Sequence, residues 1–112
     1  MIYSICLIDK NNKRPIRHEG FGYTYIHGDN SELIKATYGK YPSQWNGLSA
    51  SSFLPLIERA KEYLDATILL DATKLAPYCG KPWSDPNAVL DSFKRLIEMC
   101  RLYPDAVVEV DS

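Results

Sequence analysis

A predicted strand–helix–strand unit in the second half of the chain constrains the fold more than any other sequence feature. Residues 66–71 (ATILLD) are a continuous apolar run of strand length, which is typical of a strand covered on both faces. Asp85 and Pro86 predict an N-cap followed by proline in the first helical turn, and Pro104 ends this helix. Its apolar stripe consists of Val89, Phe93, Leu96, Ile97 and Cys100. Residues 106–110 (AVVEV) predict a last strand, so we expect a βαβ unit with parallel strands and a right-handed crossover.

The N-terminal part predicts an antiparallel hairpin. Residues 2–9 are rich in β-forming residues, and residues 17–27 contain aromatic and β-branched ones. A polar turn over residues 10–15 separates these two strands. Residues 31–38 (SELIKATY) fit either a third strand or a short helix. Partial alternation allows a strand that closes a hairpin over the turn at residues 27–30, whereas an Asp or Asn cap and Glu32 allow the helix. The short apolar run does not decide between them, and we favour the strand.

A further helix is expected between the hairpin and the βαβ unit. Ser51 or Ser52 caps it, Pro55 lies in its first turn, and it runs through Leu64. Its apolar stripe is Phe53, Leu56, Ile57, Ala60, Tyr63 and Leu64. The expected fold class is α/β, with α+β as the alternative, and the expected architecture is a small mixed sheet of about four to five strands. No linker or repeat interrupts residues 1–112, which predicts a single domain.

Composition and charge exclude several classes of protein. The 112 residues include 13 basic and 14 acidic side chains, and the formal net charge is −1. With 46% apolar residues, the chain is not expected to be disordered. Without a basic excess, we expect no bulk attraction to nucleic acid or to an anionic membrane. The first apolar run stops at Asp9 and has no basic region before it, so we expect a cytoplasmic protein without a signal peptide or a membrane span.

The cysteines and the common catalytic motifs predict neither a cofactor nor a metal. Cys6 and Cys100 lie within apolar patterns and are expected to be buried thiols, whereas Cys79 lies in a loop and is the only candidate for a reactive thiol. The chain has no CxxC, no HExxH, no zinc-type Cys/His spacing and no G-x-S-x-G elbow. We therefore expect no metal site and no cofactor.

Two aromatic loops are the candidate partner-binding surfaces. Ligands of open parallel sheets bind beyond the carboxyl ends of the strands, and the loop that follows residues 66–71 combines aromatic rings with lysines. The second loop covers residues 38–46. The alternative for both loops is that their rings only cover the core. The predicted contacts are Tyr41, Trp45, Lys74, Tyr78, Lys81 and Trp83.

The histidines and a basic patch are weaker candidates. His18 and His27 could form an acid/base pair for RNA cleavage, but positions nine apart on one strand point to opposite faces. Basic residues of the first hairpin could meet phosphates or an acidic partner, or could form only a solvated turn. The patch consists of Lys10, Lys13, Arg14, Arg17 and His18.

The second half resembles the barstar family of bacterial ribonuclease inhibitors. The resemblance rests on residues 41–47 (YPSQWNG), 64–70 (LDATILL), 89–95 (VLDSFKR) and the C-terminal strand ending at Ser112. It covers about 70 residues and implies a parallel three-stranded sheet with helices. Barstar-like inhibitors place acidic groups at the loop and helix start, whereas residues 46–57 contain no acid. The resemblance therefore implies the class of toxin-neutralising proteins and transfers no contact residue.

These observations predict a small cytoplasmic binding protein of the immunity or inhibitor type, which covers the active site of a partner toxin and has no catalytic activity of its own. One alternative is a small nuclease-like enzyme that uses His18 and His27. The other is a subunit of a homo-oligomer, such as a homodimer, joined through the aromatic loops.

Overall fold

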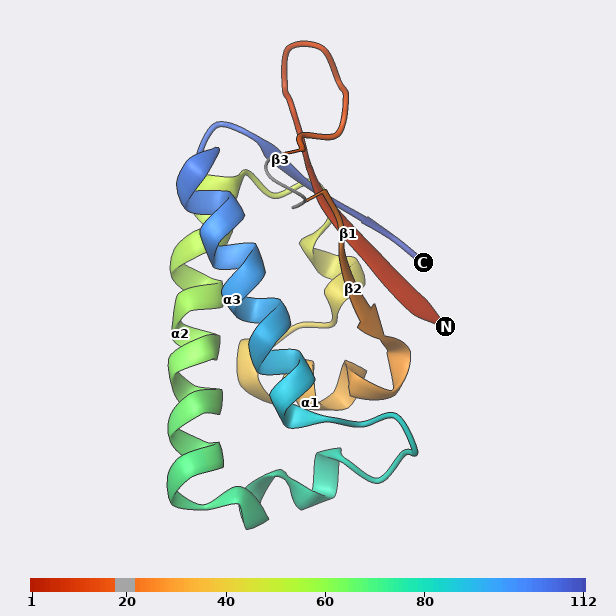
Figure 1. The fold of residues 1–112 in the computed structure, drawn as a ribbon, viewed down its shortest axis with the longest axis vertical. Helices are drawn as coiled ribbons and strands as arrows, with labels where there is room; N and C mark the ends of the chain where they lie inside the picture. Colours follow the sequence, from red (N-terminus) through yellow and green to blue (C-terminus); the bar gives the residue numbers. More distant parts are fainter. Residues whose placement is uncertain (18–21) are drawn as a thin grey trace.

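The computed structural model describes residues 1–17 and 22–112. The strands are β1 (Ile2–Ile8), β2 (Thr24–His27) and β3 (Val107–Asp111). The α-helices are α1 (Ser31–Tyr38), α2 (Ala50–Leu70) and α3 (Pro86–Leu102), and short 3-10 helices are η1 (Gly28–Asn30), η2 (Pro42–Trp45) and η3 (Ala72–Tyr78). Together they form a mixed α+β fold in which α2 and α3 run side by side next to the sheet (Figure 1).

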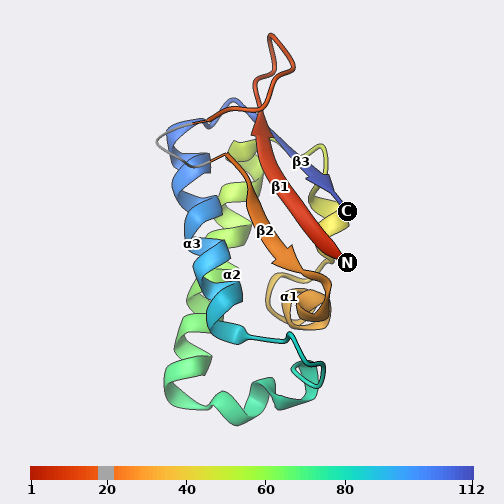
Figure 2. The same cartoon turned by 45° about the vertical axis from the view of Figure 1, so that its right-hand side comes forward.

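The sheet places β1 in the centre, in the order β2-β1-β3. Both neighbours are antiparallel to β1, and Ile5 pairs with Thr24 on one side and with Val110 on the other. Figure 2 shows β2 on the side of the sheet nearest α3, with α1 below the end of the strands. Tyr3, Ile5 and Leu7 of β1 belong to the hydrophobic core, whose largest fully buried side chains include Phe53 and Phe93.

Two predicted elements are confirmed. The first hairpin is antiparallel, as β1 pairs with β2, although in the described part of the chain its second strand covers only Thr24–His27 of the predicted residues 17–27. Helix α3 begins at Pro86, and Asp85 is its N-cap, because its carboxylate accepts a hydrogen bond from the amide of Asn87 (3.0 Å). Both elements carry strong local signals, namely β-forming residues around a polar turn and a cap followed by proline.

The predicted strand over residues 66–71 is wrong, because these residues form the last turns of α2. Neither a glycine nor a proline stands between Leu64 and Asp71, and a helix that has already nucleated extends at little cost. Leu64 and Thr67 continue its buried face, while Leu69 and Leu70 are 77% and 86% exposed. The described residues therefore contain no βαβ unit, and β3 pairs with β1 in antiparallel orientation. The described sheet has three strands instead of four to five.

The expectation of a strand over residues 31–38 is also wrong, since they form α1. Leu33 and Ile34 are adjacent in the sequence and both fully buried, which suits a helical face and not strand alternation. Gly39 ends the helix in a left-handed conformation (φ 105°), and its amide donates to the carbonyl of Lys35. Glycine adopts this conformation without steric cost.

Helix α2 also begins earlier than predicted. Its N-cap is Ser49, whose hydroxyl accepts a hydrogen bond from the amide of Ser52. Pro55 consequently lies in the second turn of α2 and not in the first. In the second turn, a proline removes one helical hydrogen bond. In the described part of the chain, no helix combines the length and the apolarity that crossing a bilayer requires.

The helical end of α2 predicts a small effect for Leu70→Ala. Leu70 is almost fully exposed, so we expect the free energy of unfolding to change by less than about 0.5 kcal/mol in urea denaturation. The matched change Leu64→Ala, on the buried face of the same helix, should lower it by about 2–5 kcal/mol. Equal losses for the two variants would instead indicate a segment that is covered on both faces.

Candidate functional site

The candidate site is a cleft of about 430 Å³ between β2 and the first turns of α3. Tyr25, Ile26 and His27 of β2 line one side of the cleft. The opposite side comes from α3, and the loop over residues 82–85 closes one end. The cleft therefore joins segments that lie more than fifty residues apart in the sequence.

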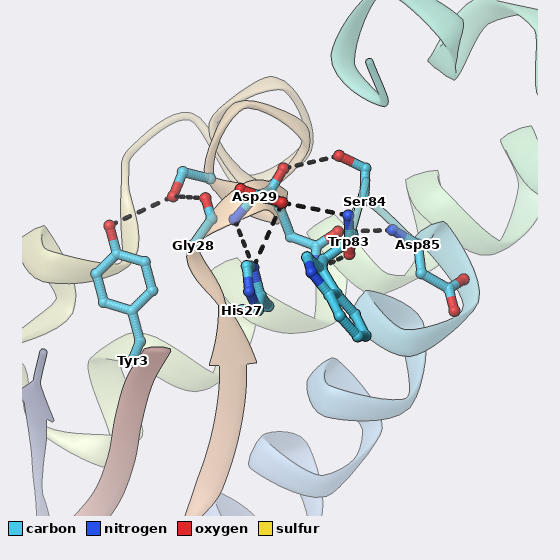
Figure 3. Close-up of polar contacts among 9 residues, drawn as sticks. Tyr3, His27, Gly28, Asp29, Trp83, Ser84 and Asp85 are labelled. Atoms are coloured by element: carbon cyan, nitrogen blue, oxygen red, sulfur yellow. Dashed lines mark hydrogen bonds and ion pairs between the residues drawn. The ribbon is translucent and has the colours of Figure 1, made fainter. Parts of the chain in front are cut away.

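Hydrogen bonds to η1 fix the loop over residues 82–85 in place (Figure 3). The amide of Trp83 donates to a carboxylate oxygen of Asp29 (3.2 Å), and the hydroxyl of Ser84 donates to the Asp29 carbonyl (2.9 Å). Asn30, which is buried, accepts from the Asp85 amide through Oδ1 (2.8 Å) and donates through Nδ2 to the Trp83 carbonyl (3.4 Å). The loop thus has a defined position although it contains no regular secondary structure.

Trp83 and His27 form an aromatic ledge at the rim of the cleft. The two rings are stacked, with centroids 5.6 Å apart and an interplanar angle of 24°. His27 Nδ1 accepts a hydrogen bond from the Asp29 amide (3.1 Å), so the neutral imidazole carries its proton on Nε2. The indole of Trp83 remains 68% exposed. The site therefore offers a large apolar surface in a fixed orientation.

The structure brings only part of the predicted loop surface to this cleft. Trp83 lies at the rim. Tyr78 and Lys81 are exposed on the same loop but do not line the cleft. Lys74 instead lines a separate hollow at the end of α2, next to Tyr63.

Trp45 is fully buried and cannot contact a partner, so its predicted role is corrected. Helix η2 turns this indole inward, where it packs between Tyr38 (centroids 5.1 Å apart) and Phe53 (5.2 Å). Tyr41 is half-buried; its hydroxyl donates to a carboxylate oxygen of Glu32 (2.8 Å). The loop over residues 38–46 therefore anchors itself to the core and to α1, which was the alternative interpretation.

The other candidates are divided between the cleft and the rest of the molecule. His27 lies in the cleft, whereas His18 is outside the described residues, so the proposed histidine pair is not tested. Lys10, Lys13 and Arg14 are exposed in the hairpin turn. The guanidinium of Arg17 lies over the ring of Tyr23, 5.9 Å from its centroid.

The thiols are held in their protonated form. Burial raises the pKa of Cys100 to about 12, and burial together with the charge of Glu109 raises the pKa of Cys6 to about 11. Burial and the nearby Asp85 carboxylate also raise the pKa of Cys79. Because the thiolate is the nucleophile, Cys79 is not an activated thiol. Within residues 1–17 and 22–112, no group of His, Cys, Asp and Glu side chains is arranged to hold a metal ion.

The two residues that hold the loop at the end of the cleft, Asp29 and Asn30, are not among the candidates predicted from the sequence. Residues 27–30 (HGDN) carry only the local signal of a turn, and the partners of Asp29 and Asn30 in residues 83–85 are too distant for any local pattern to reveal. The aromatic residues of β2 indicate a strand, but they do not indicate the cleft beside it. Comparisons with protein-family models, with curated proteins and with solved structures found no match. The function is therefore inferred from the geometry of the cleft.

Proposed function

We propose that this protein binds another protein through the cleft beside β2, with Trp83 as the anchor. The observation that carries this proposal is a tryptophan that is 68% exposed although contacts hold both its backbone and its ring. Its backbone is tied to Asp29 and Asn30, and its ring is stacked on His27. Tryptophan is enriched among residues that dominate binding energy, and a side chain that is already ordered loses little entropy on association.

The chemistry of the cleft favours binding over catalysis. The indole covers one face of the His27 imidazole, and Nδ1 is occupied by the Asp29 amide. The Asp29 carboxylate is 3.8 Å from Nδ1 and already accepts a hydrogen bond from the Trp83 amide. These groups are engaged in holding the loop, which is the role expected of a rigid binding surface.

The partner that we propose is a toxin or enzyme whose active site this protein covers, which makes it a cytoplasmic immunity or inhibitor protein. The small size, the mixed charge and the barstar-like segments support this class. The parallel sheet that the resemblance implied is not part of the described structure, in which every strand pair is antiparallel. The resemblance therefore extends to sequence segments and not to the sheet.

Replacing Trp83 by alanine is expected to weaken binding of the partner by at least about 30-fold, corresponding to about 2 kcal/mol. The partner would be captured from the native cells with the tagged wild-type protein and then titrated against each variant by calorimetry. The control is Leu70→Ala, which removes a still more exposed side chain outside the cleft and should change the affinity by less than about twofold. Similar affinities for wild type and Trp83→Ala would overturn the proposed function.

Two further measurements distinguish the alternatives. Sedimentation of the pure protein detects self-association, and a dimer that Trp83→Ala dissociates would identify the partner as a second copy of this chain. Turnover of RNA that disappears in His27→Ala would identify an enzyme instead of a binding protein.

A further inference from the structure

We infer that the cleft receives an extended peptide segment of the partner, which adds as a new strand to the free edge of β2. This inference rests on the proposed function and specifies how the partner is recognised. Strand addition of this kind derives affinity from main-chain hydrogen bonds and specificity from alternate side chains.

The pairing of β1 with β2 determines which backbone groups of β2 face the cleft. The Gly28 amide donates to the Met1 carbonyl (2.8 Å), and Ile26 pairs with Tyr3 in the same register. In an antiparallel pair, the peptide groups of successive residues face alternately towards and away from the partner strand. The amide and carbonyl of Tyr25 and the amide of His27 therefore face away from β1. No group of the described residues is hydrogen-bonded to these three.

The opposite edge of the sheet shows how the same exposure is normally avoided. Segment 46–49 covers β3: the Val108 amide donates to the Leu48 carbonyl and the Val108 carbonyl accepts from the Gly47 amide. The Val110 amide donates to the side chain of Asn46. Uncovered edges readily pair with other chains, so β2 is the edge of this sheet that can accept a strand.

The space beside β2 suits one strand with a small central side chain. A new strand lies about 4.8 Å from its neighbour, and the cleft of about 430 Å³ separates β2 from α3. A guest residue opposite Ile26 would point to the same side of the sheet as Ile26, which is buried. Ala88 and Val89 of α3 line that side of the cleft, so a small apolar residue fits there.

Charges at the two ends of β2 define the ends of the guest. The carboxylates of Asp29 and Asp85 lie at the His27 end. At the other end, the Arg17 guanidinium lies over the Tyr23 ring, 5.9 Å from its centroid. Complementary charge selects partners and sets register. The guest therefore carries a cationic residue at the His27 end and an acidic residue at the Tyr23 end.

The test uses a random ten-residue peptide library displayed on phage, selected against the wild-type protein. The expected consensus is a short segment with opposite charges on either side of a small apolar residue. N-methylation of its peptide nitrogens, one at a time, should weaken binding by at least about fivefold at every second position and have little effect between them. The amides of Tyr25 and His27 should become protected from hydrogen exchange. A library without binders, or losses that do not alternate, would refute strand addition.

Two neighbouring substitutions in α3 provide the matched control. Ala88→Leu places a larger side chain in the cleft, whereas Asn87→Leu places it on an exposed position that does not line the cleft. Both residues are helix surface positions, so both variants should fold, which circular dichroism verifies. Ala88→Leu should weaken the peptide at least about tenfold by overpacking, and Asn87→Leu less than about twofold. Equal affinities for the two variants would contradict the proposed location.

The same variants separate failure of this inference from failure of the proposed function. If Trp83→Ala weakens the captured partner but Ala88→Leu does not, the protein still binds through the aromatic ledge and strand addition is wrong. If Trp83→Ala leaves the partner unaffected, the proposed function itself is wrong, whatever the peptide library yields.

Discussion

Replacing Trp45 by alanine is expected to lower the free energy of unfolding by about 3–5 kcal/mol. The indole is fully buried and packs against Tyr38 and Phe53, so its removal leaves a large cavity in a close-packed core. In the described part of the chain its N–H has no hydrogen-bond partner, so the stabilisation comes from the apolar surface of the ring. Urea denaturation followed by circular dichroism measures the loss.

Trp83→Ala is the matched control, since it removes the same side chain from an exposed site. Its unfolding free energy should fall by about 1 kcal/mol or less, the value of a stacked pair. The two substitutions should therefore have different effects: Trp45→Ala lowers stability, and Trp83→Ala weakens partner binding. A stable Trp45→Ala variant that fails to bind the partner would contradict the assignment of Trp45 to the core.

Asn30→Ala should cost about 3 kcal/mol of unfolding free energy and also weaken partner binding. The substitution removes the buried partner of the Asp85 amide and the Trp83 carbonyl from two part-buried hydrogen bonds, and a polar group left unsatisfied away from water costs about 1–3 kcal/mol. It also releases the loop that orients Trp83, so binding then has to pay the entropy of ordering this loop. Thermal and urea unfolding measure the first effect, and titration of the captured partner measures the second.

Asn46→Ala is the control for this prediction. The side chain of Asn46 also accepts a hydrogen bond from a backbone amide, that of Val110 (2.9 Å), but this side chain is exposed. Water can replace the lost hydrogen bond there, so the cost should be about 1 kcal/mol or less, and partner binding should not change. If the two asparagine variants lose the same stability and the same affinity, the loop is not held by Asn30.

The part of the site that could be predicted from the sequence is the part encoded by local residue chemistry. The loop between residues 66–71 and the Asp85–Pro86 cap combines prolines, aromatic rings and lysines, which indicates a recognition surface, and Trp83 is exposed there. The cleft itself could not be predicted, because Asn30 and Asp85 are 55 residues apart and meet only through the packing of η1 against the start of α3. The free edge of β2 was equally hidden, because an edge is defined by which strands pair and not by the residues of one strand.

The sequence alone determined the elements whose signals are local. The antiparallel hairpin and α3 follow from β-forming residues around a polar turn and from the Asp85–Pro86 cap, since turn and cap chemistry act over only a few residues. The tertiary structure decided the conformation of residues 31–38 and 66–71, because a short apolar run fits a strand or a helix equally well until its neighbours bury one face. It also decided which of the two tryptophans is buried. Both lie in aromatic, proline-containing segments, but only Trp45 packs its ring against Phe53.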